Sequence, residues 1–361
     1  MKVVIFCGGY GTRMWPASRK SFPKQFYPLI GGRSFFQTTY IRFRKVFKPE
    51  DILVSTEKRY ISLVKKQVPE IPSRNIIAEP ERKDNLAAVG LVTALLEKRC
   101  PGEVMLVSWS DHFIGKESTF LKAMVTAGKY AQETGLIVSV NEKPKTPSTQ
   151  NEWVRFGETI DEVAGFRIVK ILETIKRPEL ELAKKMFQSD AYLLNTGYRA
   201  WRTDVMLSYF EKYQPEMYKG LIKIMEADGS KYEDTIIYRE YHKFIKDTIE
   251  FGIFVKLPQD KSVTIPTEFG WEDAGTWDLF YKAVRKNAEE NVVEGESYTK
   301  FIDSNSNLVI GPKGKAIGVI GLSNITVIDT PDGLLVSETS QTGKVKDLFG
   351  ILEKEKPEFV E

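Results

Sequence analysis

The sequence predicts an α/β fold, in which helices cover both faces of a mostly parallel sheet, followed by a small all-β module. Through the first two-thirds of the 361 residues, short apolar runs alternate with longer amphipathic segments, which is the order of β-helix-β units. After about residue 290 the runs shorten, and glycine and proline turns divide them. We therefore predict one α/β domain over residues 1–290 and a β module with a terminal helix over residues 291–361.

Five early strands are predicted where four or five consecutive residues are rich in Val, Ile and Leu, as in strands buried on both faces. In chain order they are Val3–Phe6, Ile52–Ser55, Asn75–Ala78, Val104–Val107 and Leu136–Val140. The segments between them place apolar residues at helical spacing and predict helices. These helices are Tyr60–Lys66, Leu86–Leu96 and Phe120–Glu133.

The same patterns continue to the end of the chain. Later strands are predicted over Arg167–Leu172 and Gly252–Lys256, and later helices near Glu179–Phe187, Val205–Lys212, Glu216–Glu226 and Leu279–Asn287. The β module is predicted to contain the strands Asn307–Ile310, Ala316–Ile320, Asn324–Ile328 and Leu334–Ser337, and a final helix over Val345–Glu353.

The composition excludes several classes of protein. The 52 Lys and Arg residues and 49 Asp and Glu residues give a net charge of +3 without a long basic block, so we expect no nucleic-acid partner. No run approaches the ~18 apolar residues of a membrane span, so we expect no membrane association. The N-terminal apolar run ends at Gly8, too early for a signal peptide, which predicts a cytoplasmic protein. Two cysteines and two histidines are too few for a disulfide scaffold, a Cys-rich zinc site or a His-based triad.

The strongest chemical signal is a glycine-rich turn directly after the first strand. Its glycines at positions 8, 9 and 11 have no Cβ, so backbone N–H groups there can approach an anion closely. The turn is not a dinucleotide-binding G-x-G-x-x-G, because Met14 stands where the third glycine is required, and no P-loop string is present. Four cations follow within this punctuated loop, and they suit either a triphosphate or a solvated face: Arg13, Arg19, Lys20 and Lys24.

Two carboxylates are candidates for a metal site. Asp111 follows the predicted strand at Val104–Val107, at the sheet edge where open α/β sheets bind ligands, although a helix cap or turn would also use an Asp there. Asp273 lies in Gly270–Asp278, between two tryptophans, which is typical of a ligand wall or of a structural turn. Oxygen ligands of this kind, completed by water and phosphate, suit Mg²⁺.

The segment from Gly8 to Phe26 resembles the sugar-nucleotide pyrophosphorylases, whose pattern is G-G-x-G-T-R-[LM]-W-P-x-S-R-x-x-x-P-K-Q-F. Trp15 and the Pro23–Phe26 string are most similar to the mannose-1-phosphate guanylyltransferase (GDP-mannose pyrophosphorylase) family. The resemblance spans nearly the whole chain, through Glu79-Pro80, Ser110-Asp111-His112, Asn195-Thr196-Gly197, Gly270–Asp278 and Asp329–Val336. It implies a Rossmann-like, glycosyltransferase-A-like nucleotidyltransferase domain and a left-handed β-helix-like module that often helps to make a homodimer.

The resemblance also implies a Mg²⁺-dependent reaction, in which mannose 1-phosphate attacks the α-phosphorus of GTP to form GDP-mannose and pyrophosphate. The implied catalytic residues are Arg13, Lys24 and Asp111, and the implied magnesium ligands are Asp111 and Asp273. The implied nucleotide-binding residues are Cys7, Gly8, Gly9, Gly11, Thr12, Arg13, Glu79, Asn85 and Ser110. The implied sugar-phosphate-binding residues are Lys176, Arg177, Asn195, Gly197 and Glu250.

The chain departs from the family pattern mainly where the acceptor sugar is expected. The family's F-x-E-K-P corresponds to Thr174–Pro178, where Lys176 cannot accept a hydrogen bond from a hydroxyl as Glu would. The other departures place Y-G-Y-I at Phe156–Thr159, R-N-T-A-P at Lys83–Ala87 and S-I-D-Y at Thr248–Phe251. Two alternatives therefore stay open: a guanylyltransferase for another sugar 1-phosphate, of heptose or fucose type, and a catalytically impaired nucleotide-binding homologue.

Overall fold

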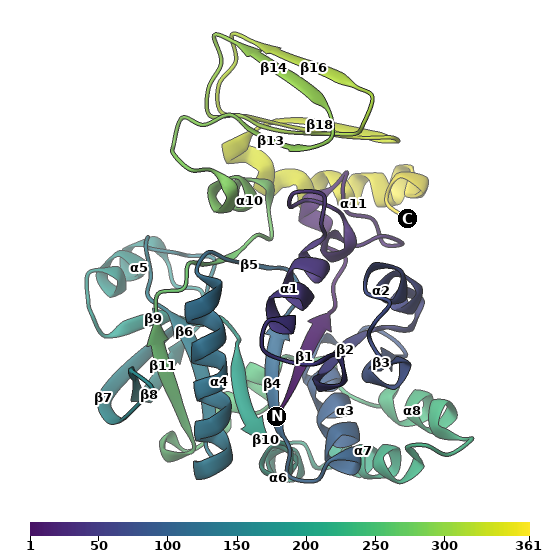
Figure 1. Cartoon of the computed structure of the whole chain (residues 1–361), viewed down its shortest axis with the longest axis vertical. Coiled ribbons are helices and arrows are strands. Elements are labelled where there is room, and N and C mark those ends of the chain that lie inside the picture. Colours follow the sequence, from purple (N-terminus) through teal and green to yellow (C-terminus); the bar gives the residue numbers. More distant parts are fainter.

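The computed structural model describes residues 1–361, and the first 290 of them are built on one ten-stranded sheet (Figure 1). Its strands are β1 (Lys2–Cys7), β2 (Ile52–Glu57), β3 (Ile76–Glu79), β4 (Val104–Trp109), β6 (Ile137–Glu142), β7 (Trp153–Val163), β8 (Phe166–Ile175), β9 (Tyr192–Leu194), β10 (Arg199–Arg202) and β11 (Ser262–Thr267). They lie in the order β11-β8-β7-β9-β6-β10-β4-β1-β2-β3. Only β8, β9 and β10 run against the others, so the sheet is mixed and mostly parallel, as predicted.

Helices cover both faces of the sheet because successive strand residues enter two different cores. In β1, Val3 and Ile5 lie in the first core, whereas Val4 and Phe6 lie in the second. The first core is covered by α1 (Phe35–Arg44), α2 (Ile61–Gln67), α4 (Glu117–Thr134) and α5 (Leu180–Phe187). The second is covered by α3 (Asp84–Arg99), α6 (Thr203–Tyr213), α7 (Pro215–Ala227), α8 (Glu233–Tyr241) and α9 (Ile249–Gly252).

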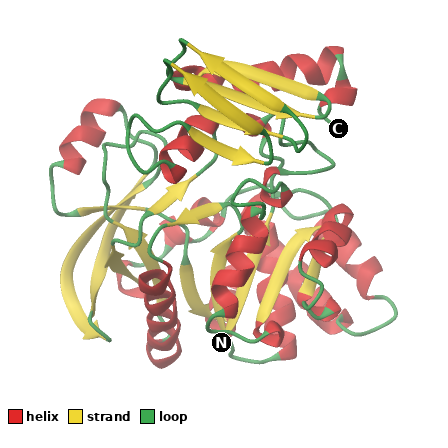
Figure 2. Ribbon diagram, turned by 45° about the horizontal axis from the view of Figure 1, so that its top comes forward, coloured by secondary structure: helices red, strands yellow, loops and turns green.

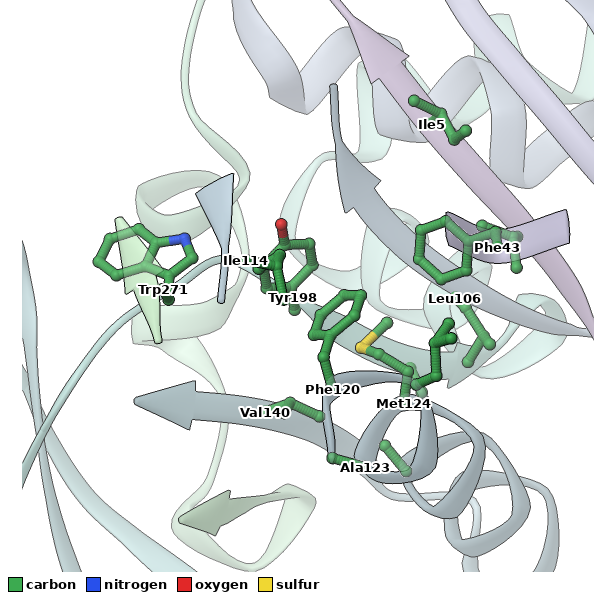
Figure 3. Packing of buried hydrophobic residues seen from close by; sticks show 14 of the residues in the cluster. Ile5, Phe43, Leu106, Ile114, Phe120, Ala123, Met124, Val140, Tyr198 and Trp271 are labelled. Carbon is green, nitrogen blue, oxygen red and sulfur yellow. The ribbon is translucent and has the colours of Figure 1, made fainter. Parts of the chain in front are cut away.

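The first core continues as a chain of aromatic rings toward the carboxyl ends of the strands (Figure 3). The ring centroids of Phe43 and Phe120 lie 5.8 Å apart, and those of Phe120 and Tyr198 lie 4.7 Å apart. Beyond Tyr198 the contacts continue to His112 and then to Trp271, at 5.4 and 5.3 Å. The side chains under this edge of the sheet are therefore fixed by close packing that begins on the helices.

The C-terminal module is a β-helix-like stack joined to the sheet domain by α10 (Trp277–Val284) (Figure 2). Its elements are β13 (Val292–Gly295), β14 (Tyr298–Ile302), β15 (Leu308–Gly311), β16 (Ala316–Ile320), β17 (Ile325–Thr330), β18 (Gly333–Glu338) and α11 (Val345–Glu355). Strands β13, β15 and β17 pair in parallel, and β14 pairs in parallel with β16. Successive strands thus alternate between two small sheets, as the coils of a β-helix do, and β18 closes the stack antiparallel to β17.

The module packs against the loop that follows the glycine turn, and the two segments share one hydrophobic core. The indole Nε1 of Trp15 donates a hydrogen bond to the carbonyl oxygen of Phe359 at 2.9 Å. The backbone N–H of Lys20 donates to the carbonyl oxygen of Val360, also at 2.9 Å. The C-terminal residues therefore hold the outer side of this loop, more than 300 residues away in the sequence.

The strand predicted over Gly252–Lys256 is wrong. The segment contains the end of α9 and a single 3-10 turn over Phe254–Lys256. It is apolar because Ile253 is fully buried in the second core and Gly252 packs against Leu86 of α3, so the pattern reflects burial against a helix. The other predicted strands and helices are present with shifted ends. The sequence patterns did not reveal α1, α8, α9, β7, β9, β10, β11, β13, β14 or the short strands β5 (His112–Ile114) and β12 (Trp271–Asp273).

Candidate active site

A polar cavity of about 430 Å³ opens beyond the carboxyl ends of β1 to β4, where open α/β sheets bind ligands. Ten of the residues expected at the site line it: Gly8, Gly9, Glu79, Asn85, Asp111, Arg177, Asn195, Gly197, Glu250 and Asp273. Seven do not line it: Cys7, Gly11, Thr12, Arg13, Lys24, Ser110 and Lys176. The sheet thus brings residues from most of the predicted set into one space.

The glycine turn is held from below by one buried amide. The Nε2 of Gln25 lies 3.2 to 3.3 Å from the carbonyl oxygens of Cys7, Gly8 and Gly9. Gly9 has a left-handed φ of 82°, which favours glycine. Because three successive carbonyls converge on one side chain, the turn is fixed before any ligand arrives.

Asp111, which lines the cavity, forms an ion pair with Lys24, which lies behind the lining. The Nζ of Lys24 lies 2.9 Å from Oδ2 of Asp111, and the lysine side chain is only 8% exposed. Burial opposes ionisation of Asp111, but the adjacent ammonium outweighs it and holds the pKa of this carboxyl below its usual value. Asp111 is therefore an anion, as a metal ligand must be.

Asp273 is brought beside Asp111 by the two short strands β5 and β12, which pair antiparallel with Asp273 opposite His112. The turn before β12 is held by Glu142, whose carboxylate accepts 2.8 Å hydrogen bonds from the N–H groups of Phe269 and Gly270. Both of these hydrogen bonds come from backbone N–H groups, so Glu142 contributes to the site by orienting β12.

The side chain of Trp271 locks β12 onto β5. Its Nε1 donates a 3.0 Å hydrogen bond to Nδ1 of His112. Burial lowers the pKa of His112, so the imidazole is neutral and its Nδ1 can accept this bond. His112 therefore supports β12 from a position between Asp111 and Asp273.

The two carboxylates fit a magnesium ion that arrives with a nucleotide. No group of three or more His, Cys, Asp or Glu side chains is arranged to hold a metal ion. Asp111 and Asp273 both line the cavity, and Mg²⁺ commonly uses one or two carboxylates together with phosphate and water. Arg13 lies nearby: a Cβ on Gly275 would be 2.6 Å from Nη2 of Arg13 and 3.2 Å from Oδ1 of Asp273.

The residues expected at the nucleotide already have protein partners. Glu79 accepts hydrogen bonds from Oγ of Ser55 at 2.8 Å and from the hydroxyl of Tyr241 at 3.1 Å. Burial raises the pKa of Glu79 to about 7. The side-chain oxygen of Asn85 accepts from the N–H of Ile249 at 2.8 Å. These two side chains therefore shape the cavity wall as well as facing it.

Cys7 and Ser110 lie beneath the cavity floor. Both are buried, and the N–H of Ser110 donates to the carbonyl oxygen of Phe6 at 3.1 Å. Burial raises the pKa of the Cys7 thiol. Gly11 and Thr12 begin the 3-10 turn that carries Arg13, outside the cavity wall.

A connected set of polar side chains forms the opposite end of the cavity. Arg199 pairs with Glu250 at 2.7 Å and donates to Oδ1 of Asn195 at 3.4 Å. The Nδ2 of Asn195 in turn donates to Oε2 of Glu152 at 3.2 Å. Gly197 is required beside them, because at its φ of 76° a Cβ would lie 2.5 Å from Nε1 of Trp109. The sequence analysis missed Arg199, although it follows the recognised Asn195–Gly197 string by two residues.

Two segments that were expected at this end of the cavity lie outside it. Lys176 is exposed outside the cavity, and its Nζ lies 4.4 Å from the ring centroid of Phe251 in a cation–π contact. The Phe156–Thr159 segment lies along β7 and does not line the cavity either. The residues just before β7, Gln150–Glu152, line it instead. No motif marked Glu152 in the sequence.

Comparisons with known proteins agree with this arrangement. A family described as nucleotidyl transferase matches residues 2–290, and a family described as MannoseP isomerase/GMP-like beta-helix domain matches residues 301–352. The mannose-1-phosphate guanylyltransferase of Salmonella montevideo is 29% identical over 363 residues, which cover 98% of this chain and 74% of that protein. The enzyme of the same name from Escherichia coli is 26% identical over 353 residues, covering 96% and 74%.

A solved structure shares the complete fold. The crystal structure described as mannose-1-phosphate geranyltransferase from Thermus thermophilus superposes with a TM-score of 0.87 at 24% sequence identity, and covers 98% of this chain and 99% of that one. The nucleotidyl transferase match extends over most of the chain, from the first strand to the end of the sheet domain. The chain therefore belongs to the nucleotidyl transferase family.

Proposed function

We propose that the protein is a mannose-1-phosphate guanylyltransferase, which forms GDP-mannose and pyrophosphate from GTP and mannose 1-phosphate. The observation that carries the proposal is the Lys24–Asp111 ion pair, with Asp273 beside it and the glycine turn at the same cavity. The names of the relatives from Salmonella montevideo and Escherichia coli support the choice of nucleotide and sugar.

The chemistry needs no Ser, Cys or His nucleophile. A phosphate oxygen of the sugar 1-phosphate forms a bond to the α-phosphorus of GTP, and the bond from that phosphorus to the bridging oxygen breaks, so that pyrophosphate leaves with its electron pair. The protein must hold two mutually repelling anions in line and neutralise the charge that grows on the α-phosphate.

The charged residues in and around the cavity are suited to this task. Lys24 is a nearly buried cation, and Arg13 is a permanent cation beside Asp273, so both can neutralise phosphate without reorganising solvent. Asp111 and Asp273 would hold Mg²⁺, which supplies Lewis-acid stabilisation of phosphate oxygens when it is bound. The fixed glycine turn offers its backbone to the phosphates.

A second candidate is a guanylyltransferase for another sugar 1-phosphate, of heptose or fucose type. It is favoured by the acceptor end of the cavity, where Lys176 is outside and Glu152 inside. A protein that binds nucleotide without turnover is disfavoured, because such a protein has no need for the buried Lys24–Asp111 pair.

One assay separates these functions. The purified protein is incubated with GTP, Mg²⁺ and a panel of sugar 1-phosphates, and GDP-sugar and pyrophosphate are both measured. We expect GDP-mannose as the main product and its loss when EDTA removes the metal. A higher kcat/KM with a heptose or fucose 1-phosphate would establish the second candidate. No pyrophosphate with any acceptor would overturn the assignment as an active transferase.

We further propose that the protein acts in the cytoplasm and forms a homodimer through the β module. Support for the dimer comes from apolar side chains on the β14–β16 sheet, where Ile302 and Ile320 are register neighbours that are 56% and 67% exposed, and Tyr298 is 66% exposed. No helix in the structure is long and apolar enough to span a bilayer. Light scattering should give twice the chain mass, reduced to one chain by Ile320→Glu; a monomeric wild type would overturn the dimer.

A further inference from the structure

Glu152 occupies an unusual position at the acceptor end of the cavity. It lies immediately before β7, lines the cavity and is linked twice to Asn195. The N–H of Asn195 donates to the carbonyl oxygen of Glu152 at 2.8 Å, and the side-chain Nδ2 of Asn195 donates to Oε2 at 3.2 Å. The carboxylate is therefore held at one place although it is on a loop.

Most of the polar side chains around Glu152 are already committed to one another. The amide of Asn195 uses its oxygen for Arg199 and Gly197 and its nitrogen for Glu152. Arg199 is neutralised by Glu250 at 2.7 Å and stacks on the ring of Phe254 at 3.9 Å. Asn195 therefore has little hydrogen-bonding capacity left for a ligand, whereas Arg199 uses only its Nη2 and keeps N–H donors but offers no acceptor.

Glu152 has one carboxylate oxygen that is free to form a hydrogen bond with a ligand. Its Oε2 accepts from Asn195, while Oε1 makes no hydrogen bond within the protein and is not among the buried atoms that lack a partner, so solvent reaches it. Burial and the nearby Glu250 raise the pKa of Glu152, whereas Asn195, Arg199 and Arg177 lower it. In the ionised form the carboxylate only accepts hydrogen bonds, so the group that then completes Oε1 is a donor. On a sugar 1-phosphate the donors are hydroxyl groups, since the phosphate is an acceptor.

We propose that Glu152 selects the acceptor, by accepting a hydrogen bond from one hydroxyl group of the sugar 1-phosphate through Oε1. The inference rests on the proposed function and names the residue that gives it sugar specificity. It also explains how the site works with a lysine at position 176: Lys176 is outside the cavity, and the hydroxyl acceptor comes from the loop before β7 instead.

The test compares mannose 1-phosphate with its 2-, 3-, 4- and 6-deoxy analogues in the wild type and in Glu152→Ala, by kcat/KM for GDP-sugar formation. A hydrogen bond to a charged group corresponds to roughly 10- to 100-fold in kcat/KM. We expect the wild type to lose this factor for one deoxy position. In Glu152→Ala, kcat/KM with mannose 1-phosphate should be reduced by a similar factor. It should not be reduced further when that deoxy analogue replaces mannose 1-phosphate. The KM for GTP should stay unchanged.

Glu158→Gln is the matched control, because Glu158 is an exposed carboxylate on β7, outside the cavity, paired with Lys170. It should keep the wild-type profile. A uniform loss across all analogues in Glu152→Ala, or no loss at all, would overturn the inference while the proposed function stands. If the wild type makes no GDP-sugar, the proposed function fails, and the inference is then judged by calorimetric titration of mannose 1-phosphate into wild type and Glu152→Ala: equal affinities would overturn it.

Discussion

Replacing Gly11 by alanine tests whether the glycine turn keeps Lys24 in place. Gly11 has a φ of 68°, and a Cβ built there would lie 2.6 Å from Cγ of Lys24 and 2.9 Å from its Cβ and Cδ. These are the stem atoms of the lysine, not its flexible end, so the whole side chain must shift. Its ammonium would then leave Asp111, which it contacts at 2.9 Å.

The structure also offers a control that separates backbone strain from displacement of the lysine. Gly32 has a φ of 75° in an exposed turn, and no atom lies within 4 Å of a Cβ built there. Both alanine variants carry a left-handed backbone penalty of roughly 1–2 kcal/mol. Only Gly11→Ala should also lower kcat, by roughly 10²-fold, because it displaces a preorganised charge.

The assay is pyrophosphate release at saturating GTP and mannose 1-phosphate, together with urea unfolding of each variant. Gly32→Ala should keep wild-type turnover with reduced stability. The double variant Gly11→Ala/Lys24→Ala should be no slower than Lys24→Ala alone, since both changes act through one ammonium. Turnover of Gly11→Ala equal to that of Gly32→Ala, or losses that multiply in the double variant, would show that Gly11 does not act by keeping Lys24 in place.

Four further variants examine the site and the contacts that support it. Lys24→Ala and Asp111→Ala should each lower kcat roughly 10²- to 10³-fold; near-normal turnover of either purified variant would remove that residue from the mechanism. The pKa of Glu79, raised to about 7 by burial, means that the folded protein holds a proton that the unfolded chain has lost. The free energy of unfolding should therefore fall by about 2 kcal/mol as the pH rises from about 5.5 to about 8. Urea unfolding should show no such fall in Glu79→Gln. The same pH dependence in the wild type and in Glu79→Gln would contradict this assignment. Trp15→Phe leaves the carbonyl oxygen of Phe359 without its donor, so it should lower the free energy of unfolding by about 1 kcal/mol. An unchanged midpoint of urea unfolding would contradict this expectation.

The parts of the fold that the sequence predicts well are those where local pattern and burial agree. Strand β1 is predictable because both its faces are buried, so its residues from Val3 to Cys7 are all apolar. Helix α1 escaped prediction because Phe35–Arg44 is rich in aromatic and β-branched residues, and its start depends on a capping box between Ser34 and Gln37. Strand β10 was missed because its residues Arg199–Arg202 include two arginines, and the burial of Arg199 depends on its pairing with Glu250, distant in the sequence.

The same division holds for the site. The positions of Gly8, Gly9 and Asp111 at the cavity could be predicted because each follows directly on the carboxyl end of a strand that the local pattern reveals. Glu152 could not, because its position depends on a backbone hydrogen bond from Asn195, 43 residues later in the chain. The position of Lys176 outside the cavity could not be predicted for a related reason: it follows the end of β8 and its Nζ lies over the ring of Phe251, and no motif records either feature.

The contact between the C-terminal residues and the loop after the glycine turn also constrains how this protein can be recombined with its relatives. Trp15 and Lys20 each donate to a carbonyl of the final residues, and Val360 is fully buried at the junction. A chimera that receives its β module from another parent must inherit the matching loop with it. The two ends of the gene therefore form one unit of exchange, and crossover points are best chosen so that both come from the same parent.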